Sequence, residues 1–138
     1  MVELNTWHRG RLIDHVSLVV ADFEACKRFY IAVFDVLGVP VNEGDGYLFA
    51  DELFISPGEP LTGRAHIAFQ AADPAMVKRF YEAALAAGGR DNGAPGERVY
   101  HPGYYAAFVL DPEGNNIEAV THGPARRSGP SVVMTDDN

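Results

Sequence analysis

Two stretches of the chain align without a gap: residues 14–38, DHVSLVVADFEACKRFYIAVFDVLG, and residues 65–89, AHIAFQAADPAMVKRFYEAALAAGG. Identical residues occupy equivalent positions 51 residues apart: His15 and His66, Asp22 and Asp73, Lys27 and Lys78, Arg28 and Arg79, Phe29 and Phe80, Tyr30 and Tyr81, Ala32 and Ala83, Gly38 and Gly89. A series of identities at one separation indicates an internal duplication, so we expect one structural unit to occur twice.

Each copy begins with the pattern of a strand followed by a helix. Apolar and polar residues alternate over 12–20 and again over 64–71, which predicts a strand in both places. Asp22 and Asp73 then offer side-chain oxygens for a helix N-cap, and apolar residues recur at helical spacing after each of them. Glycine at 38 and at 88–89 is typical of the end of a helix.

Short apolar segments separated by turn residues follow each predicted helix. The expected strands are VPVN (39–42), GYLFA (46–50) and LFIS (53–56) in the first copy, and GERVY (96–100), YYAAFVLD (104–111) and NNIEAVT (115–121) in the second. Breaks are expected at Asn92–Gly96 and at Asp111–Gly114. The sequence therefore predicts an α+β fold of two β-α-β-β-β modules, about 12–57 and 64–122. They form one domain over 1–122, followed by a flexible tail over 123–138.

The composition limits the classes of partner. The 138 residues are 47% hydrophobic and carry a formal net charge of −8, which disfavours nucleic acid and anionic membrane surfaces. We find no apolar run of the ~20 residues needed to span a bilayer, and the first 15 residues lack the apolar stretch of a secretory signal. The single cysteine, Cys26, cannot form an internal disulfide, so we expect a cytoplasmic protein.

The duplicated histidines and one glutamate predict a metal site. Strand alternation places His15, His66 and Glu118 on sheet faces opposite the more apolar faces that should pack on the helices. An unpaired buried carboxylate within IEAV (117–120) is costly, and a divalent ion such as Zn, Ni, Mn or Fe(II) would remove that cost. Two histidines and one carboxylate with open positions are the ligands of a catalytic metal. The alternative is two ordinary strand histidines and a Glu118 paired with an arginine.

Further candidate residues surround this predicted site. His101 is a candidate acid or base, because imidazole titrates near neutrality, or else a solvated side chain. If residues 104–111 form a strand, one of Tyr104 and Tyr105 must face the concavity, unless both cover its rim. We predict a catalytic role for His101, Tyr105 and Glu118. The predicted substrate contacts are Gln70, Tyr104, Phe49 and Phe54.

The segments DHVSLVV, AHIAFQA and YYAAFVLDPEGNNIEAV, with the helices that follow the first two, resemble the vicinal oxygen chelate superfamily of glyoxalases, bleomycin resistance proteins and extradiol dioxygenases. The resemblance covers about residues 13–122. It implies two modules that pair into a half-barrel metal cup, with His15, His66 and Glu118 as the ligands. It also implies a homodimer in which the partner chain can complete the cup.

The sequence departs from the glyoxalase I enzymes at their fourth ligand, a Glu or Gln on the last strand of the first module. That strand here has Ser56 as its one polar residue, with Glu52 in the preceding turn. The resemblance implies a divalent-metal-dependent, glyoxalase-like enzyme of lyase or isomerase type, acting on a small substrate chelated through vicinal oxygens. The alternatives are an Fe(II) extradiol-type dioxygenase, which the three-ligand set supports, and a metal-free small-molecule-binding resistance protein.

Overall fold

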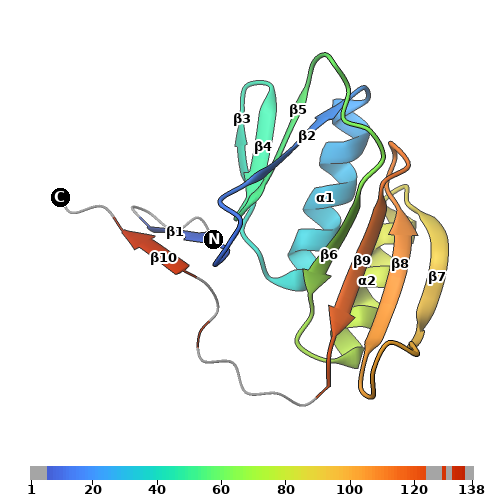
Figure 1. The fold of residues 1–138 in the computed structure, drawn as a ribbon. Coiled ribbons are helices and arrows are strands. Elements are labelled where there is room, and N and C mark those ends of the chain that lie inside the picture. The colour runs from blue at the N-terminus through green and yellow to red at the C-terminus, as the bar shows by residue number, and fades with distance from the viewer. Residues whose placement is uncertain (1–5, 124–128, 130–131, 136–138) are drawn as a thin grey trace.

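The computed structural model describes residues 6–123, 129 and 132–135. Two four-stranded sheets, each with one helix, form the body of the protein (Figure 1). The first module contains β2 (Val16–Val20), α1 (Phe23–Leu37), β3 (Asn42–Gly44), β4 (Tyr47–Ala50) and β5 (Leu53–Pro57). The second contains β6 (His66–Gln70), α2 (Pro74–Ala86), β7 (Arg90–Glu97), β8 (Tyr105–Leu110) and β9 (Asn116–Thr121).

The two sheets have the same strand order, β2-β5-β4-β3 and β6-β9-β8-β7. In each sheet the first and last strands of the module pair in parallel, and the other neighbours are antiparallel. These observations confirm the predicted α+β class and the duplicated β-α-β-β-β unit. Within the described residues the two sheets stay separate and do not close into a barrel.

A third, two-stranded sheet joins the two ends of the chain. β1 (Thr6–Arg9) pairs antiparallel with β10 (Val132–Thr135). The sequence predicts a flexible tail over 123–138, and this short strand lies inside it. The rest of that tail, apart from 123 and 129, is outside the described residues.

The helix ends follow the predicted chemistry. The Asp22 side chain accepts a hydrogen bond from the Ala25 N–H at the start of α1, at 3.0 Å, and Asp73 does the same for Met76 in α2, at 2.8 Å. Gly38 ends α1 in the left-handed region with φ of 74°, where a residue without Cβ is favoured.

Both helices pack into one common core. The centroid of the Phe34 ring of α1 lies 5.1 Å from that of the Phe69 ring of β6, and buried residues of both modules form a single cluster. On β2, Leu18 and Val20 are buried in this core while Ser17 is exposed, as alternation predicts, but Val16 at the start of the strand is exposed. Each sheet therefore has a core face, which packs on the helices, and an opposite face, which we call the open face.

The prediction for residues 90–100 was wrong. A break was expected at Asn92–Gly96 and a strand over 96–100, but β7 runs from Arg90 to Glu97. Bulges let the strand accommodate glycine and proline, because its pairing with β8 shifts register at Gly93 and again before Gly96. The Arg98 guanidinium donates to the carbonyls of Ala94 and Gly96, both at 2.8 Å, and so stabilises the irregular backbone.

Candidate functional site

A buried carboxylate lies in the middle of the second module's sheet. Glu118 of β9 is 1% exposed and lies between Ala68 of β6 and Phe108 of β8 in the strand register. Its Oε1 lies 2.8 Å from Nε2 of His66, and its Oε2 accepts a hydrogen bond from the Tyr104 hydroxyl. Both carboxylate oxygens therefore have partners, and these are a histidine and a tyrosine rather than an arginine.

His66 connects this carboxylate with the surface. It is the first residue of β6, its side chain is 55% exposed, and its ring centroid lies 6.0 Å from that of Phe108. Gln70 lies on the same open face of β6 and is exposed. An imidazole that contacts a buried carboxylate while it remains accessible can bind a metal ion or a substrate.

Tyr104 is a fixed hydrogen-bond donor to Glu118. Burial, together with the hydrogen bond to the Glu118 carboxylate, raises the pKa of Tyr104 to about 12. The phenol therefore keeps its proton at neutral pH. Tyr105, the predicted catalytic tyrosine, is half-buried and packs against the hydrophobic core. The structure thus brings Tyr104, not Tyr105, to the carboxylate.

We predict that, in the metal-free protein, the Tyr104 phenol loses its proton at a higher pH than an ordinary tyrosine does. A tyrosine whose pKa is raised on folding stabilises the fold fully below its ordinary pKa near 10, and this contribution is lost as pH rises through about 12. A phenolate absorbance titration of the wild type minus that of Tyr104→Phe should show one group with a midpoint near 12. A difference step centred near 10 would contradict the assignment.

Two further histidines lie beside Tyr104. His101 Nε2 is 2.9 Å from His122 Nδ1, and both rings meet the Tyr104 ring edge-on, with centroids 5.4 and 5.1 Å away. Gly103 allows this approach, because a Cβ there would lie 2.9 Å from the His122 carbonyl oxygen. Sequence reasoning predicted His101 but missed His122. Continuing the alternation two positions past Val120 would have indicated it.

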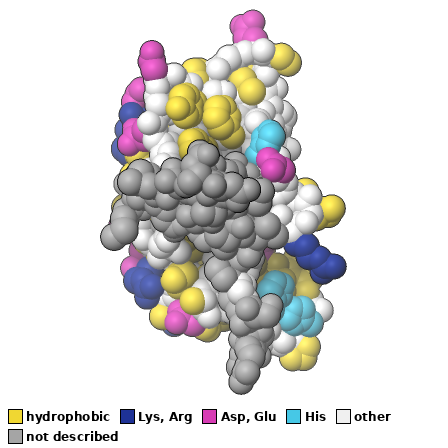
Figure 2. Space-filling view, turned by 90° about the vertical axis from the view of Figure 1, so that its left-hand side faces the viewer, with side chains coloured by type: hydrophobic (Ala, Val, Ile, Leu, Met, Phe, Trp, Pro, Cys, Tyr) yellow, Lys and Arg dark blue, Asp and Glu magenta, His cyan; other side chains and the backbone are white. Residues whose placement is uncertain are grey.

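The structure does not bring His15 to this cluster. His15 lies just before β2 in the first module, its side chain is 60% exposed, and its Nδ1 is 2.8 Å from Oδ1 of Asp14. In Figure 2 hydrophobic side chains gather in the upper part of the view beside a histidine and an acidic residue, and other histidines lie in the lower part. Within the described residues, no three His, Cys, Asp or Glu side chains are arranged to hold a metal ion.

The strand register identifies the first-module counterpart of Glu118 as Phe54. Phe54 pairs with Ser17 of β2 and Phe49 of β4, as Glu118 pairs with Ala68 of β6 and Phe108 of β8. Ser17 and Ala68 are equivalent in the duplication, since they are 51 residues apart. A phenyl ring therefore occupies the place where a second acidic ligand would stand.

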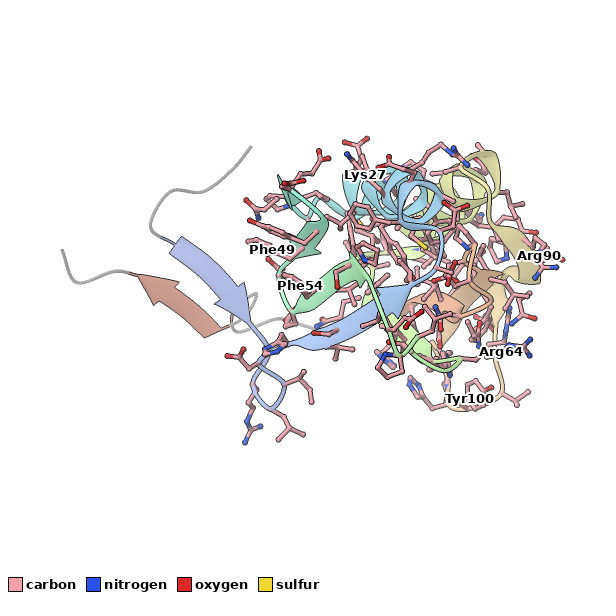
Figure 3. The ribbon with its side chains drawn as sticks, turned by 90° about the horizontal axis from the view of Figure 1, so that it is seen from above. Lys27, Phe49, Phe54, Arg64, Arg90 and Tyr100 are labelled. Atoms are coloured by element: carbon pink, nitrogen blue, oxygen red, sulfur yellow. The ribbon has the colours of Figure 1, made fainter. Side chains whose placement is uncertain are left out.

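Neither residue considered for the fourth ligand occupies that place. Glu52 lies in the turn before β5, and Ser56 pairs with Val19, two residues further along the strand. The two predicted aromatic contacts, Phe49 and Phe54, lie side by side on the face away from α1 (Figure 3). Tyr47 joins them, and its position two residues before Phe49 on one strand could have predicted this.

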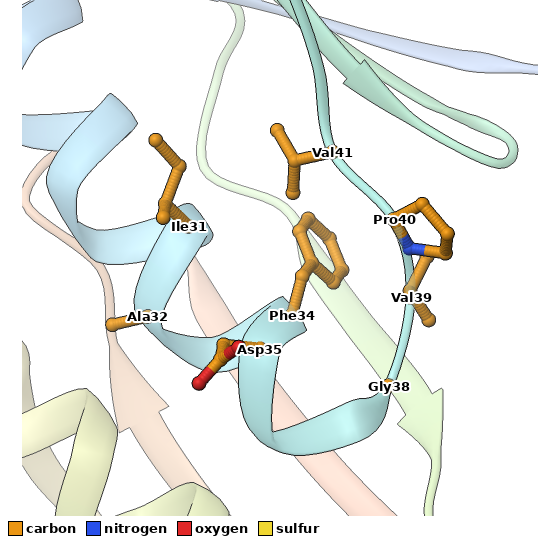
Figure 4. Close-up of a pocket in the computed structure, with 8 residues that line it drawn as sticks. All are labelled: Ile31, Ala32, Phe34, Asp35, Gly38, Val39, Pro40 and Val41. Carbon is orange, nitrogen blue, oxygen red and sulfur yellow. The ribbon is translucent and has the colours of Figure 1, made fainter. Parts of the chain in front are cut away.

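A separate surface hollow of about 430 Å³ lies at the C-terminal end of α1 (Figure 4). Its lining residues are Ile31, Ala32, Phe34, Asp35, Gly38, Val39, Pro40 and Val41. Asp35 is its single titratable side chain, so this hollow lacks the chemistry of the Glu118 cluster.

The fold and the site define a protein of paired β-α-β-β-β modules with a histidine and a carboxylate on an open sheet face. The chain belongs to the Glyoxalase/Bleomycin resistance protein/Dioxygenase superfamily, whose sequence profile matches residues 12–119. The resemblance stated from the sequence is thereby confirmed. No helix in the described part of the chain has the length and apolar character to cross a membrane.

Three solved structures illustrate the similarity. A glyoxalase/bleomycin resistance protein from Albidiferax ferrireducens T118 is 28% identical, with a TM-score of 0.69 over 79% of this chain and 97% of that one. The fosfomycin resistance protein FosX from Mesorhizobium loti is 24% identical (TM-score 0.61, 80% and 92% covered). Lactoylglutathione lyase from Agrobacterium tumefaciens is 20% identical (TM-score 0.58, 80% and 92% covered). The last two show similarity of fold alone, and comparison with curated proteins finds no significant match.

Proposed function

We propose that this protein is a divalent-metal-dependent enzyme of lyase or isomerase type that acts on a small substrate held through two vicinal oxygens. The observation that carries the proposal is the pairing of His66 with the buried Glu118 on an open sheet face. Imidazole and carboxylate are suitable ligands for Zn, Ni, Mn or Fe(II). The superfamily to which the chain belongs includes glyoxalases and dioxygenases.

The donor atoms fit such an ion. Two ligand atoms bound to one ion with bonds of ~2.0–2.2 Å lie about 3 Å apart when they are adjacent in the coordination shell. His66 Nε2 and Glu118 Oε1 are separated by 2.8 Å, so these two atoms would be available to hold one divalent ion together. Tyr104 would keep the carboxylate oriented through its other oxygen.

We infer that the third ligand is His15 of a second copy. Both helices share one core, so the two open faces of a chain are turned away from that core and from each other. The His15 ring therefore does not meet Glu118 of its own chain and contacts the Asp14 carboxylate instead. Leu12, 90% exposed, and Ile13, 46% exposed, provide an apolar surface next to His15 that a partner could cover. In a homodimer, the first-module open face of one copy would meet the second-module open face of the other.

The side chains on the open face have distinct chemical roles in this proposal. A bound divalent ion would supply a Lewis acid that polarises a substrate carbonyl. Tyr104, protonated at neutral pH, donates a hydrogen bond to Glu118 and keeps that carboxylate in place. His101 and His122, linked through ring nitrogens, form an acid–base pair beside Tyr104 that can accept or return a substrate proton.

The buried cysteine and the net charge bear on the location of the protein in the cell and on its partners. Burial raises the pKa of the Cys26 thiol to about 12, so this lone cysteine is kept protonated and unreactive. A single buried thiol is compatible with the cytoplasm, which we propose as its location. We propose a small molecule as its substrate and, in view of the net charge of −8, neither nucleic acid nor membrane as its partner.

An Fe(II)-dependent, extradiol-type dioxygenase is the second candidate function. The position of Phe54 favours it, because a proton shuttle between two metal-bound carboxylates has no second acid at that place. The evidence for a metal-free binding protein is weaker, since such a protein gives no metal-binding role to the pair of His66 and Glu118.

The two enzymatic functions are tested with the protein loaded separately with Zn, Ni, Mn and Fe(II). We expect isomerisation of the methylglyoxal–thiol adduct with at least one metal, and loss of that rate in His66→Ala. Oxygen uptake with a panel of catechols under Fe(II), without isomerisation, would transfer the assignment to the dioxygenase. A protein that binds none of these metals would refute both.

A further inference from the structure

The surface hollow at the C-terminal end of α1 is lined almost entirely by apolar side chains and lies apart from the Glu118 cluster. Ile31 and Asp35 of the helix line one side, and residues 39–41, which lead to β3, line the other (Figure 4). Neither open face contributes a lining residue, so the homodimer proposed above does not use this surface. The volume of about 430 Å³ is within the range of small-molecule sites.

The internal duplication indicates that the fold does not require this apolar surface. Ile31 is half-buried and lies outside the hydrophobic core cluster, and its equivalent in α2 is Glu82. The half-buried segment 39–41, Val-Pro-Val, corresponds to the exposed segment 90–92, Arg-Asp-Asn, at the same separation of 51 residues. The first module therefore has apolar side chains at surface positions where the second has polar and charged ones, which is typical of a binding surface.

The edge of the hollow carries a negative charge that the chain does not balance. Asp35 is exposed in the last turn of α1, where the helix dipole already places a partial negative charge. That turn has no basic residue, and no cation of the described residues pairs with the Asp35 carboxylate. A carboxylate at this end of a helix is unfavourable, and the equivalent residue of α2 is Ala86. The hollow thus combines an apolar wall with an unbalanced negative edge.

We propose that this hollow binds an apolar ammonium compound. The hydrocarbon part lies against Ile31, Phe34 and residues 39–41, and the cationic nitrogen lies beside Asp35. Contact with apolar side chains favours any hydrocarbon of suitable size, because the hydrophobic effect is not directional. The carboxylate and the helix end select a positive charge. The inference is independent of the proposed metal-dependent function, since the two sites share no residue.

The test compares three compounds with the same six-carbon chain and different charges: hexylammonium, hexanol and hexanoate. Their binding to the full chain is measured by nuclear magnetic resonance, through the shifts of backbone amides within residues 31–41. We expect hexylammonium to bind about 3- to 10-fold more tightly than hexanol, and hexanoate to bind most weakly. Added salt should reduce the preference for the cation, because it screens exposed charges.

Two variants separate the charged part of the site from its apolar part. Asp35→Asn should bring the ratio of the hexylammonium and hexanol affinities close to one and leave the hexanol affinity nearly unchanged. The variant should fold, because it removes an unfavourable charge from the end of the helix. Val41→Asn introduces the residue of the second module, Asn92, and should weaken both compounds by a similar factor, since it removes apolar surface.

The matched control is Glu24→Gln, in the first turn of the same helix. Glu24 and Asp35 are 11 residues apart, or about 16 Å along the helix axis, which exceeds the screening length at physiological salt. The control should therefore leave the affinity ratio unchanged. Equal binding of hexylammonium and hexanol by the wild type would overturn the inference. Shifts confined to residues outside 31–41, or an unchanged ratio in Asp35→Asn, would overturn it too, and each result would leave the metal-dependent function standing.

Discussion

Glu118→Gln is expected to weaken the binding of a divalent ion by about 100-fold or more, because it removes the charged ligand of the site. The amide has nearly the same shape as the carboxylate, and its oxygen can still accept the hydrogen bond from Tyr104. The fold should therefore survive, and the loss should appear in metal affinity measured by competition with a chromophoric chelator.

The matched control for this variant is Glu52→Gln. Glu52 lies in the turn before β5, away from the strand position equivalent to Glu118. Its replacement should change metal affinity by less than about threefold, since it removes the same charge from the chain at a position that the strand register does not match to Glu118. Equal losses in the two variants would mean that net charge, and not ligation by Glu118, determines the affinity.

Asp111→Ala is expected to cost about 3–5 kcal/mol of unfolding free energy, because it removes a buried charged acceptor of several hydrogen bonds. Asp111 is 1% exposed and directly follows the strand β8. Its oxygens accept from the backbone N–H groups of Glu113 and Asn115, from the Asn115 side chain, and from the hydroxyl of Tyr30 on α1. Urea unfolding monitored by circular dichroism measures the loss.

Tyr30→Phe provides the comparison for that loss. It removes one of the four hydrogen bonds to Asp111 and should cost about 1 kcal/mol. Burial and the nearby Asp111 carboxylate raise the pKa of Tyr30 well above its ordinary value, so the phenol is a donor throughout the working pH range. A smaller loss in Asp111→Ala than in Tyr30→Phe would show that this network does not stabilise the contact between the modules.

The sequence predicted most of the fold because its local signals agree with its duplication. The caps at Asp22 and Asp73 and the alternation in β2 and β6 are properties of neighbouring residues, and each occurs twice. The tight turn at Asp111–Gly114 was also predicted, but its contact with Tyr30 was not, since that contact joins residues 81 positions apart. β7 was missed because glycine and proline indicate a turn unless bulges and the side chain of Arg98 compensate for them.

The candidate site was predicted in part for a similar reason. His66 and Glu118 lie on adjacent parallel strands, so alternation was sufficient to place them on one face. Tyr104 directly precedes β8 and lies on the same face as Phe108, which pairs with Glu118. The sequence did not give this register between β8 and β9, so it could not indicate Tyr104 in preference to Tyr105. His15 has the same local sequence position as His66, but the packing of both helices in one core directs the two open faces apart. The directions of the two open faces are set by tertiary packing, and no pattern of neighbouring residues indicates them.

In the proposed site, one ion is held by His66 and Glu118 of one copy and by His15 of another. The most direct measurement is the metal content of a mixture of His15→Ala and Glu118→Gln, refolded together and dialysed against a weak chelator. Each variant alone should retain no ion. In the mixture, each hybrid dimer combines one intact site with one doubly altered site, which gives about one retained ion per four chains. A mixture that retains no ion, like each variant alone, would contradict a site shared between two copies.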